Sequence, residues 1–339
     1  MTPPVRRPTN VTGAASRPQA ASGGSRPDPR RSTNAVGSED LRPITDALAE
    51  GAARLQIPDG VAMVLAVSGG PDSTALLHGA AAMAADRGWR LTVGHLDHGL
   101  REMSAKEAAA AAAIAAGLGL PAEVRRVEVA GLAASEHRSL EDAGRQARYR
   151  FLEEVAATLG EGTLIVTAHT ADDAAETVLL RLARGSGLRG LRGIPARRGR
   201  IVRPLLHARR APLRAALDAA GIGYLTDPSN TDLAHARNWV RAELLPALER
   251  LNPAAVEALT RFGRLAADDD DLLDALATAE LALRRDVTDA SIDWHEPPGR
   301  ALGRRVLRRA IGDSAPSAER IEALLDAAEG PRGGLIIEL

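Results

Sequence analysis

Residues 61–74 join a continuous apolar run to a small, glycine-bearing turn and then to the start of a helix. Gly69 and Gly70 let the backbone approach a ligand closely, and the first N–H groups of the helix carry a partial positive charge. Pro71 is tolerated there because early helical N–H groups have no intrahelical partner. This order of strand, turn and helix predicts a phosphate site. An ordinary strand-to-helix junction is the alternative interpretation.

The turn lacks the Gly-Lys-Ser/Thr ending of a Walker A loop, which disfavours lysine-assisted transfer of a γ-phosphate. It resembles the PP-loop signature of the ATP pyrophosphatase superfamily, whose members cleave ATP between the α and β phosphates and form an adenylated intermediate. The residues that carry this resemblance are consecutive: Ser68, Gly69, Gly70, Pro71, Asp72 and Ser73.

Short β-like runs alternate with longer helical stretches from residue 41 onward. We expect strands at 61–67, 91–95, 124–129 and 163–168, and helices at 74–87, 104–118, 140–159 and 171–184. This βαβ series predicts an α/β fold with a mostly parallel sheet and helices on both faces. Ligands of such sheets bind at the carboxyl ends of the strands, so the phosphate turn, residues 95–101 and residues 169–173 should converge on one crevice.

The chain is long enough for two domains with cores. Residues 1–40 are rich in Pro, Arg, Ser, Gly and Thr, which predicts a disordered extension without a secretory h-region. This acid-poor start also resembles an organellar transit peptide. Further helices are expected at 211–220, 234–248 and 253–285, with a β-like run at 335–339. Asn252-Pro253 marks a boundary, which predicts a catalytic domain at 41–250 and a smaller, mainly helical domain at 251–339.

Charge is unevenly distributed along the chain. The net charge is −1, yet eleven arginines and no carboxylate lie between Thr177 and Leu217. Arginine suits phosphates and stacked bases, so this stretch indicates RNA contact or a solvated basic surface. The sequence has no cysteine, which excludes disulfides and thiolate chemistry from its own residues. It also has no apolar run long enough to predict a membrane span.

Carboxylates gather where a helix is expected to follow the fourth strand. Thr170 and Asp173 fit a capping box, which would give Asp173 a structural role. A cap needs one carboxylate, however, and Asp172, Asp173 and Glu176 supply three. Asp173 and Glu176 are neighbours on the helix surface, and such a cluster can hold Mg²⁺ bridging phosphates or a cationic ligand. We therefore favour a functional role.

Other polar residues are ambiguous by themselves. His95, Asp97 and His98 could bind a metal, although a polar loop is the simpler interpretation. Arg145 and Arg148 could form a fork for a carboxylate or phosphate, or lie in solvent. Arg237 and Arg241 share a helix face that could bind RNA or a phosphate of ATP.

Taken together, these motifs resemble the tRNA(Ile)-lysidine synthetase family. The matching segments occur in the family's order and spacing at residues 68–73, 95–101, 140–149, 169–190, 203–206, 227–230 and 237–241. The resemblance runs from about residue 61 to 241, is weaker over 244–274, and is most distinctive over 170–190. Ala168 and Gly144 depart from the residues usual at their positions, and the chain resembles the short form of the family.

The resemblance implies ligation of L-lysine to the wobble cytidine of the CAU anticodon of tRNA(Ile), with ATP and Mg²⁺. Residues 68–73 would hold pyrophosphate, Asp72 and Asp173 would bind Mg²⁺, and His95 and Asp97 would border the adenosine. By the same resemblance, the remaining catalytic residues include His169, Asp173 and Glu176, which would lie at the site for ATP and lysine. Arg145 or Arg148 would bind the carboxylate of lysine or AMP. The resemblance also implies that the enzyme is cytoplasmic and that its C-terminal domain contacts tRNA. It leaves open whether the protein forms a homodimer.

Two other functions stay open at this point. A PP-loop tRNA 2-thiolation enzyme would use the same adenylation, but it normally draws on thiolates or an iron–sulfur cluster, and this sequence has no cysteine. A non-catalytic nucleotide- or RNA-binding scaffold would bind ATP without making pyrophosphate. The carboxylates near Asp173 favour catalysis over such a scaffold.

Overall fold

The computed structural model describes residues 39–99, 104–226, 232–284, 291–294, 298–312, 317–329 and 336–338. The predicted extension at 1–40 lies almost wholly outside these residues. So do the motif at 227–230 and the end of the 95–101 segment.

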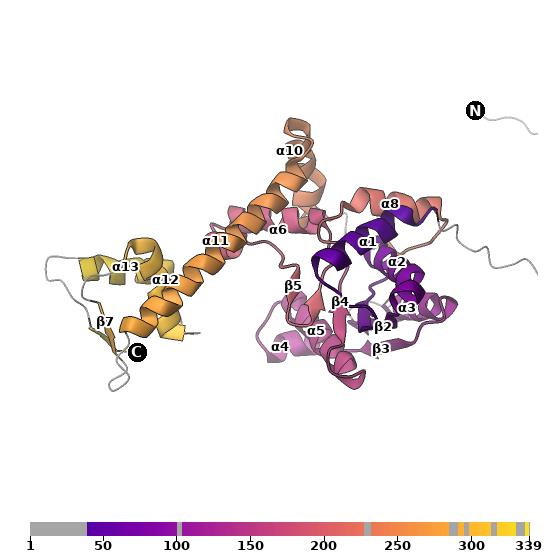
Figure 1. Cartoon of the computed structure of the whole chain (residues 1–339), viewed down its shortest axis with the longest axis horizontal. Coiled ribbons are helices and arrows are strands. Elements are labelled where there is room, and N and C mark those ends of the chain that lie inside the picture. The colour runs from indigo at the N-terminus through magenta and orange to yellow at the C-terminus, as the bar shows by residue number, and fades with distance from the viewer. Residues whose placement is uncertain are drawn as a thin grey trace, which may run out of the picture. The chain divides into compact units, whose positions relative to one another are not determined.

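A six-stranded sheet lies at the centre of the fold (Figure 1), in the order β3-β2-β1-β4-β6-β5. Its strands are β1 (Ala62–Ala66), β2 (Arg90–Asp97), β3 (Ala122–Arg126), β4 (Leu164–Val166), β5 (Arg197–Arg198) and β6 (Ile201–Val202). Every neighbouring pair is parallel except β5 and β6, which pair antiparallel. The predicted mostly parallel sheet is therefore confirmed.

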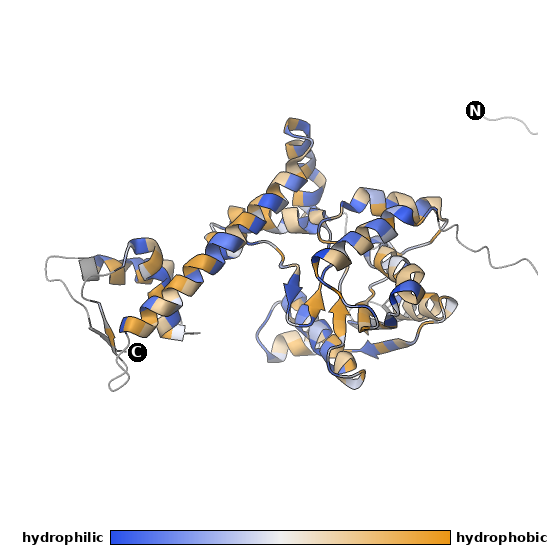
Figure 2. Ribbon diagram, viewed as in Figure 1, coloured by the Kyte–Doolittle hydropathy of each residue, from blue (hydrophilic) through white to orange (hydrophobic). Residues whose placement is uncertain are grey.

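Helices cover both faces of the sheet, as the apolar runs predict. Residues of β1 alternate between two cores: Met63 and Leu65 pack in one, and Val64 packs in the other. The first core includes residues of α1 (Arg42–Arg54), α2 (Pro71–Arg87), α3 (Ser104–Gly117) and α8 (Arg210–Ala219). The second includes residues of α5 (Leu140–Thr158). Burial on both faces explains why the central strands are hydrophobic throughout (Figure 2).

The expected long helices are confirmed to within a few residues in α2, α3, α5, α8 and α6 (Ala171–Ala183). Residue 129 was expected to end a strand, but it begins a helix, α4 (Val129–Ser135). The sequence reasoning did not identify α1, α4 or the four-residue α7 (Leu188–Leu191). The helix expected at 234–248 is divided into α9 (Ala236–Trp239), the π-helical segment η2 (Val240–Leu244) and α10 (Leu245–Leu251).

The C-terminal part begins with a 30-residue helix, α11 (Ala255–Arg284). It contacts α6 and α7, and also α12 (Arg300–Ile311). A small core around Trp294 and Leu325 joins α11 and α12 to α13 (Ala318–Glu329) and β7 (Ser291–Asp293), which pairs with β8 (Ile336–Glu338). The domain boundary at 250/251 stays a prediction. None of the helices described is both long and apolar enough to cross a membrane.

Candidate active site

A cleft of about 470 Å³ opens where β1, β2 and β4 end. The topology thus brings the three expected segments to one crevice. Most of the predicted site residues line this cleft: Ser68, Gly70, Pro71, Asp72, Ser73, His95, Asp97, Arg145, Arg148, His169 and Asp173. Four others, Gly69, Glu176, Arg237 and Arg241, are not among its lining residues.

The N-terminus of α2 borders the cleft without a side-chain cap. Its N-cap is Gly70, which has no side chain to accept a hydrogen bond. By contrast, Ser139 caps α5 and Thr170 caps α6. Because the first N–H groups of a helix have no intrahelical acceptor, the start of α2 remains a donor set for an anion.

Ser73 and Gly69 fix the shape of the phosphate turn. The Ser73 hydroxyl donates to the Gly70 carbonyl over 3.0 Å and accepts from the Ser68 N–H over 3.2 Å. Gly69 has a φ of +83°, and a Cβ there would lie 2.6 Å from Leu225 Cδ1. The Leu225 N–H also donates to the Gly69 carbonyl. The turn is therefore shaped by its own serine and by the segment that ends at Leu225.

Asp72 has one engaged and one unengaged carboxylate oxygen. Oδ2 accepts from Arg210 Nε over 2.9 Å, whereas the buried Oδ1 has no hydrogen-bond partner among the described residues. Burial raises the pKa of the Asp72 carboxyl above its usual range, although Arg210 acts in the opposite direction. Oδ1 is thus an oxygen ligand without a partner at the edge of the phosphate turn.

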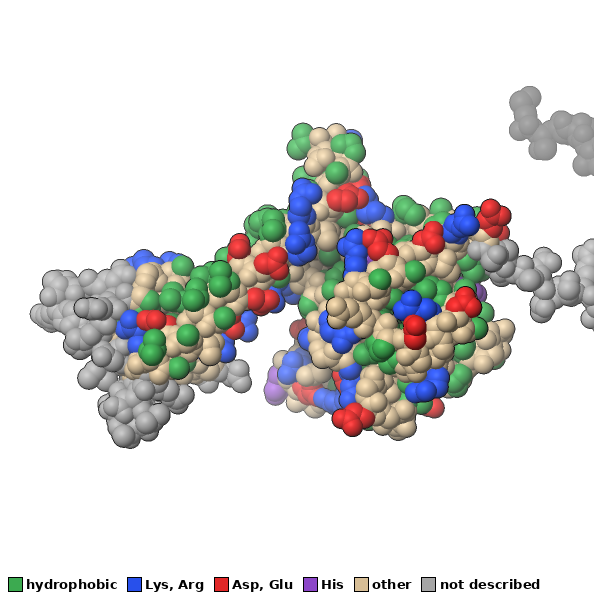
Figure 3. Space-filling view, in the orientation of Figure 1, with side chains coloured by type: hydrophobic (Ala, Val, Ile, Leu, Met, Phe, Trp, Pro, Cys, Tyr) green, Lys and Arg blue, Asp and Glu red, His purple; other side chains and the backbone are tan. Residues whose placement is uncertain are grey.

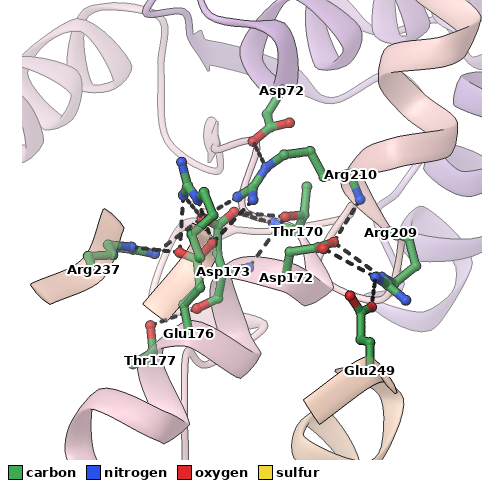
Figure 4. Close-up of polar contacts among 11 residues, drawn as sticks. Asp72, Thr170, Asp172, Asp173, Glu176, Thr177, Arg209, Arg210, Arg237 and Glu249 are labelled. Atoms are coloured by element: carbon green, nitrogen blue, oxygen red, sulfur yellow. Dashed lines mark hydrogen bonds and ion pairs between the residues drawn. The ribbon is translucent and has the colours of Figure 1, made fainter. Parts of the chain in front are cut away.

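Asp173 uses both oxygens (Figure 4). Oδ2 accepts from the Thr170 N–H and hydroxyl, each over 2.9 Å, and completes a capping box. Oδ1 accepts from Arg210 Nη2 over 2.8 Å and from Arg237 Nη2 over 3.1 Å. Burial alone would raise the Asp173 pKa, but Arg210 and Arg237 hold it below its usual range. The structure thus shows the capping box on one oxygen and pairing with two arginines of the protein on the other, while a ligand-binding role for Asp173 stays a prediction.

Glu176 lies fully buried beneath three guanidinium groups. It accepts from Arg241 Nε over 2.7 Å, from Arg237 Nε over 2.8 Å and from Arg210 Nη1 over 3.2 Å. These interactions lower its pKa although burial acts to raise it. The carboxylates of Asp72, Asp173 and Glu176 are thus balanced by an equal number of arginines, and the cluster carries no net charge.

Asp172 serves a separate role at the start of α8. Its Oδ2 accepts from the backbone N–H of Arg210 over 2.7 Å, and its carboxylate also pairs with Arg209. Arg209 pairs in turn with Glu249 (Figure 4). Asp172 therefore anchors the residue whose side chain reaches Asp72, Asp173 and Glu176.

Arg210 is the central residue that sequence reasoning missed. It contacts Asp72 across 138 positions of the chain. The arginine-rich, carboxylate-free stretch was the only signal, and it did not distinguish Arg210 from ten other arginines.

His169, which lines the cleft, is uncharged near neutral pH. Burial lowers the pKa of His169 to about 4, and its Nδ1 lies 2.9 Å from the Thr167 hydroxyl. His95 places Nδ1 2.8 Å from the Val67 carbonyl and so donates to it. Asp97 accepts from the Gly99 N–H, as in a turn. His95 and Asp97 thus shape the strand end beside the cleft.

The sequence suggested His98 only as a possible metal ligand, whereas in the structure it is the partner of Arg148. Arg148 Nη2 lies 2.8 Å from His98 Nε2, and burial lowers the pKa of His98 to about 4, with a further contribution from Arg148. A Cβ at Gly144 would lie 3.3 Å from His98 Nδ1. The absence of a side chain at Gly144 therefore leaves room for this ring.

The described residues contain no group of three or more His, Cys, Asp or Glu side chains suited to holding a metal ion. Mg²⁺ commonly uses one or two carboxylates and completes its shell with phosphates and water. The unpartnered Oδ1 of Asp72 fits that arrangement. Asp173 would have to release Arg210 or Arg237 before it could join.

A glycine turn, an uncapped helix and a parallel sheet define a nucleotide-binding protein of the PP-loop class, and the family model for the PP-loop domain matches residues 45–248. Within that class, the chain belongs to the tRNA(Ile)-lysidine synthase family. The tRNA(Ile)-lysidine synthase of Salinispora tropica is 48% identical over 235 residues, which cover 68% of this chain and 69% of the relative. That of Thermobifida fusca is 41% identical over 276 residues, covering 79% and 83%.

The match to the tRNA(Ile)-lysidine synthase of Geobacter sulfurreducens is 42% identical and covers 81% of this chain but 61% of the relative. The chain thus spans about three fifths of that longer protein. Among solved structures, the U34-tRNA thiolase NcsA from Methanococcus maripaludis has a similar fold, with a TM-score of 0.58 at 12% identity. That match covers 68% of this chain and 81% of the thiolase.

Proposed function

We propose that this protein ligates L-lysine to C2 of the wobble cytidine in the CAU anticodon of tRNA(Ile), so that the tRNA reads AUA. ATP first adenylates the C2 oxygen and releases pyrophosphate; the ε-amine of lysine then attacks C2 and expels AMP. One observation carries the proposal beyond family membership: the uncapped start of α2 and the Asp173 carboxylate line the same cleft.

In the adenylation step, the start of α2 would hold the departing pyrophosphate. Its N–H groups are fixed in place by the turn, so they can stabilise developing negative charge without reorganising. Asp72 and the phosphates would hold Mg²⁺, with Asp173 as the second predicted ligand. When bound, the ion neutralises phosphate charge. His95 and Asp97, at the end of β2, would border the adenosine.

In the lysine step, the substrate's α-ammonium would take the place of a guanidinium at Asp173. Arg210 and Arg237 both occupy Oδ1, so exchanging one cation for another preserves the charge balance of the cluster with Glu176. His169 is neutral and adds no positive charge beside the incoming ammonium. Arg145 or Arg148, on the same cleft, would bind lysine's carboxylate or AMP.

The proposal also names a cellular setting and a tRNA-contacting region. We propose that the protein acts on tRNA in the cytoplasm and that residues 251–339 contact the tRNA outside the cleft. A 2-thiolation function is disfavoured because the sequence supplies no cysteine.

The direct test uses purified protein, ATP, Mg²⁺ and labelled L-lysine. We expect label to enter an isoleucine tRNA with a CAU anticodon, with release of pyrophosphate and AMP, and not to enter methionine tRNA. ATP binding without pyrophosphate release would instead indicate a scaffold. An intact, folded sample that incorporates no lysine would overturn the proposal.

We also propose that the protein forms a homodimer through α11. Apolar side chains on this helix remain exposed at intervals of three, four or seven residues: Phe262, Leu265, Leu272, Leu276 and Leu283. They lie beside the buried face of α11, and Figure 3 shows hydrophobic side chains along the helix. Spacing of this kind suits pairing with an identical helix.

A further inference from the structure

Three arginines surround Tyr149, and none of them has a carboxylate partner among the described residues. The guanidinium carbons of Arg145 and Arg198 lie 5.1 and 5.4 Å from the centre of the Tyr149 ring. Arg203 Nη2 donates to the Tyr149 hydroxyl over 3.3 Å. We call these residues the Tyr149 arginine cluster. Across the described ranges, none of its arginines forms an ion pair with Asp or Glu, in contrast to Arg210.

Arg203 is the most constrained member of this cluster. Only 2% of the residue is exposed, and its Nε has no hydrogen-bond partner within the described part of the chain. Burial lowers the pKa of Arg203; Tyr149 acts to raise it, and the nearby charges of Arg145 and Arg198 lower it further. Uncompensated cations held close together repel one another, so an anion placed among them would be strongly favoured.

We propose that the Tyr149 arginine cluster binds a phosphodiester group of the RNA next to the nucleotide that is modified. This inference rests on the proposed function. Tyr149 and Arg145 line the cleft, and Arg198 is exposed at the edge of the sheet, so the cluster connects the cleft with the surface. Guanidinium groups match the geometry of phosphate oxygens and also stack on flat rings.

The sheet order separates the strand of Arg198 from the phosphate turn. The phosphate turn follows β1, whereas Arg198 lies on β5, three strands away in the order β1-β4-β6-β5. At about 4.8 Å per strand, this corresponds to roughly 14 Å. The backbone of Arg198 thus lies well away from the turn that would hold the phosphates of ATP.

The two-residue strand β5 offers a matched pair of variants. Successive side chains of a strand point to opposite faces. Arg198 lies over Tyr149, whereas Arg197 Nη2 donates to the Leu55 carbonyl over 3.1 Å. Both arginines are exposed, so either can be changed to alanine without opening a core.

The test compares Arg198→Ala with Arg197→Ala in the full chain, using a tRNA(Ile) transcript in filter binding across a series of salt concentrations. For Arg198→Ala we expect the Kd for tRNA to rise roughly fivefold and the salt slope to fall by about one, because one phosphate contact is lost. Arg197→Ala should match the wild type. The Kd for ATP should be unchanged in both, and the Tm of Arg198→Ala should not fall.

Several outcomes would overturn the inference. Equal tRNA binding by the two variants would do so, as would a higher Kd for ATP with unchanged tRNA binding, which would assign the cluster to the nucleotide. A loss confined to the CAU tRNA, with an unrelated tRNA unaffected, would indicate base recognition instead. Wild-type protein that shows the expected tRNA binding but incorporates no lysine would contradict the proposed function while leaving this site in place.

Discussion

Asp173 separates two physical tasks between its two oxygens. Oδ2 closes the N-terminus of α6 through Thr170, and Oδ1 holds guanidinium groups of Arg210 and Arg237. Replacing Asp173 by asparagine can therefore test capping and charge pairing separately, because the amide side chain keeps an oxygen that accepts a hydrogen bond but carries no charge.

We expect Asp173→Asn to fold but to transfer lysine about 100-fold more slowly, since fixed charge contributes on this scale to catalysis. The loss of charge beside buried arginines should cost on the order of 2 kcal/mol of stability. Lysine incorporation and thermal unfolding would be measured together. The control is Thr170→Val, which removes the capping hydroxyl for about 1 kcal/mol but leaves Oδ1 in place. A near-normal rate in Asp173→Asn would leave capping as the residue's whole role.

The lowered pKa of His98 should make the stability of the folded protein depend on pH. Its pKa is about 4 in the folded protein and 6.5 when free, so between these values the unfolded chain binds more protons. Its contribution to stability is complete above about pH 6.5 and is lost as the pH falls toward 4. Burial is the main cause; Arg148 and His95 act in the same direction, and Asp97 opposes them.

Between pH 7 and pH 5, the wild type should therefore lose about 1–2 kcal/mol more stability than His98→Gln. Glutamine can still accept the hydrogen bond from Arg148 without titrating. Urea unfolding at the two pH values measures the difference. Parallel losses in the two proteins would show that His98 is not buried in its neutral form.

At the residue scale, the sequence predicted those site residues that lie close to the end of a strand. His95 lies near the end of β2 and Asp173 follows β4, so the topology alone brings them to one cleft. Arg210 and His98 gain their roles only through partners far away in sequence, Asp72 and Arg148, and no local pattern records such pairings.

Among the elements, α2 matters most for function because its N-cap is a glycine, which leaves the first N–H groups of the helix free of a side-chain cap. Gly69 combines a positive φ with contact to Leu225, so it is constrained in two ways. Gly88 ends the same helix with a φ of +62°, and its nearest neighbour would lie 3.5 Å from an added Cβ. Both glycines have a positive φ, but Gly69 lies in the phosphate turn whereas Gly88 lies at the other end of the helix.

We expect Gly69→Ala and Gly88→Ala each to lose about 1–2 kcal/mol of stability from the left-handed backbone. Only Gly69→Ala should weaken ATP binding, by about tenfold or 1.4 kcal/mol, because only there does the turn that binds phosphate shift. Calorimetric titration with ATP distinguishes them. Equal ATP affinity in both variants would contradict the phosphate role of the turn.

Several elements that the sequence did not reveal are too short to show a periodic pattern, although the 13-residue helix α1 was missed as well. Helices α2, α5 and α6 span several turns, and strand β1 is a continuous apolar run; all four were predicted closely. Strand β5 has two residues and helix α7 has four, too few for a period to appear. The π-helical segment η2 inside the expected helix at 234–248 also leaves no pattern, because its neighbours are helical as well.

At the scale of the whole molecule, α11 is the element whose exposed surface is hardest to explain in a single chain. Leu272 is 62% exposed and Leu276 is 47% exposed on a helix that already buries another face. A continuous apolar stripe in water favours association, and an identical stripe has the matching length and spacing. The proposed dimer therefore depends on this helix.

We expect the wild type to sediment as a dimer and Leu272→Glu as a monomer, because a buried carboxylate opposite its own copy would be desolvated and repelled. The matched control is Leu251→Glu, at an 84% exposed position at the end of α10 and outside the stripe, which should remain dimeric. Sedimentation velocity over a range of protein concentrations distinguishes these cases. A monomeric wild type, or a Leu272→Glu variant that sediments like it, would show that α11 meets no second copy. Lysine incorporation by the monomeric variant would then reveal whether one chain holds a complete cleft, as the contacts among Asp72, Asp173 and Arg210 indicate.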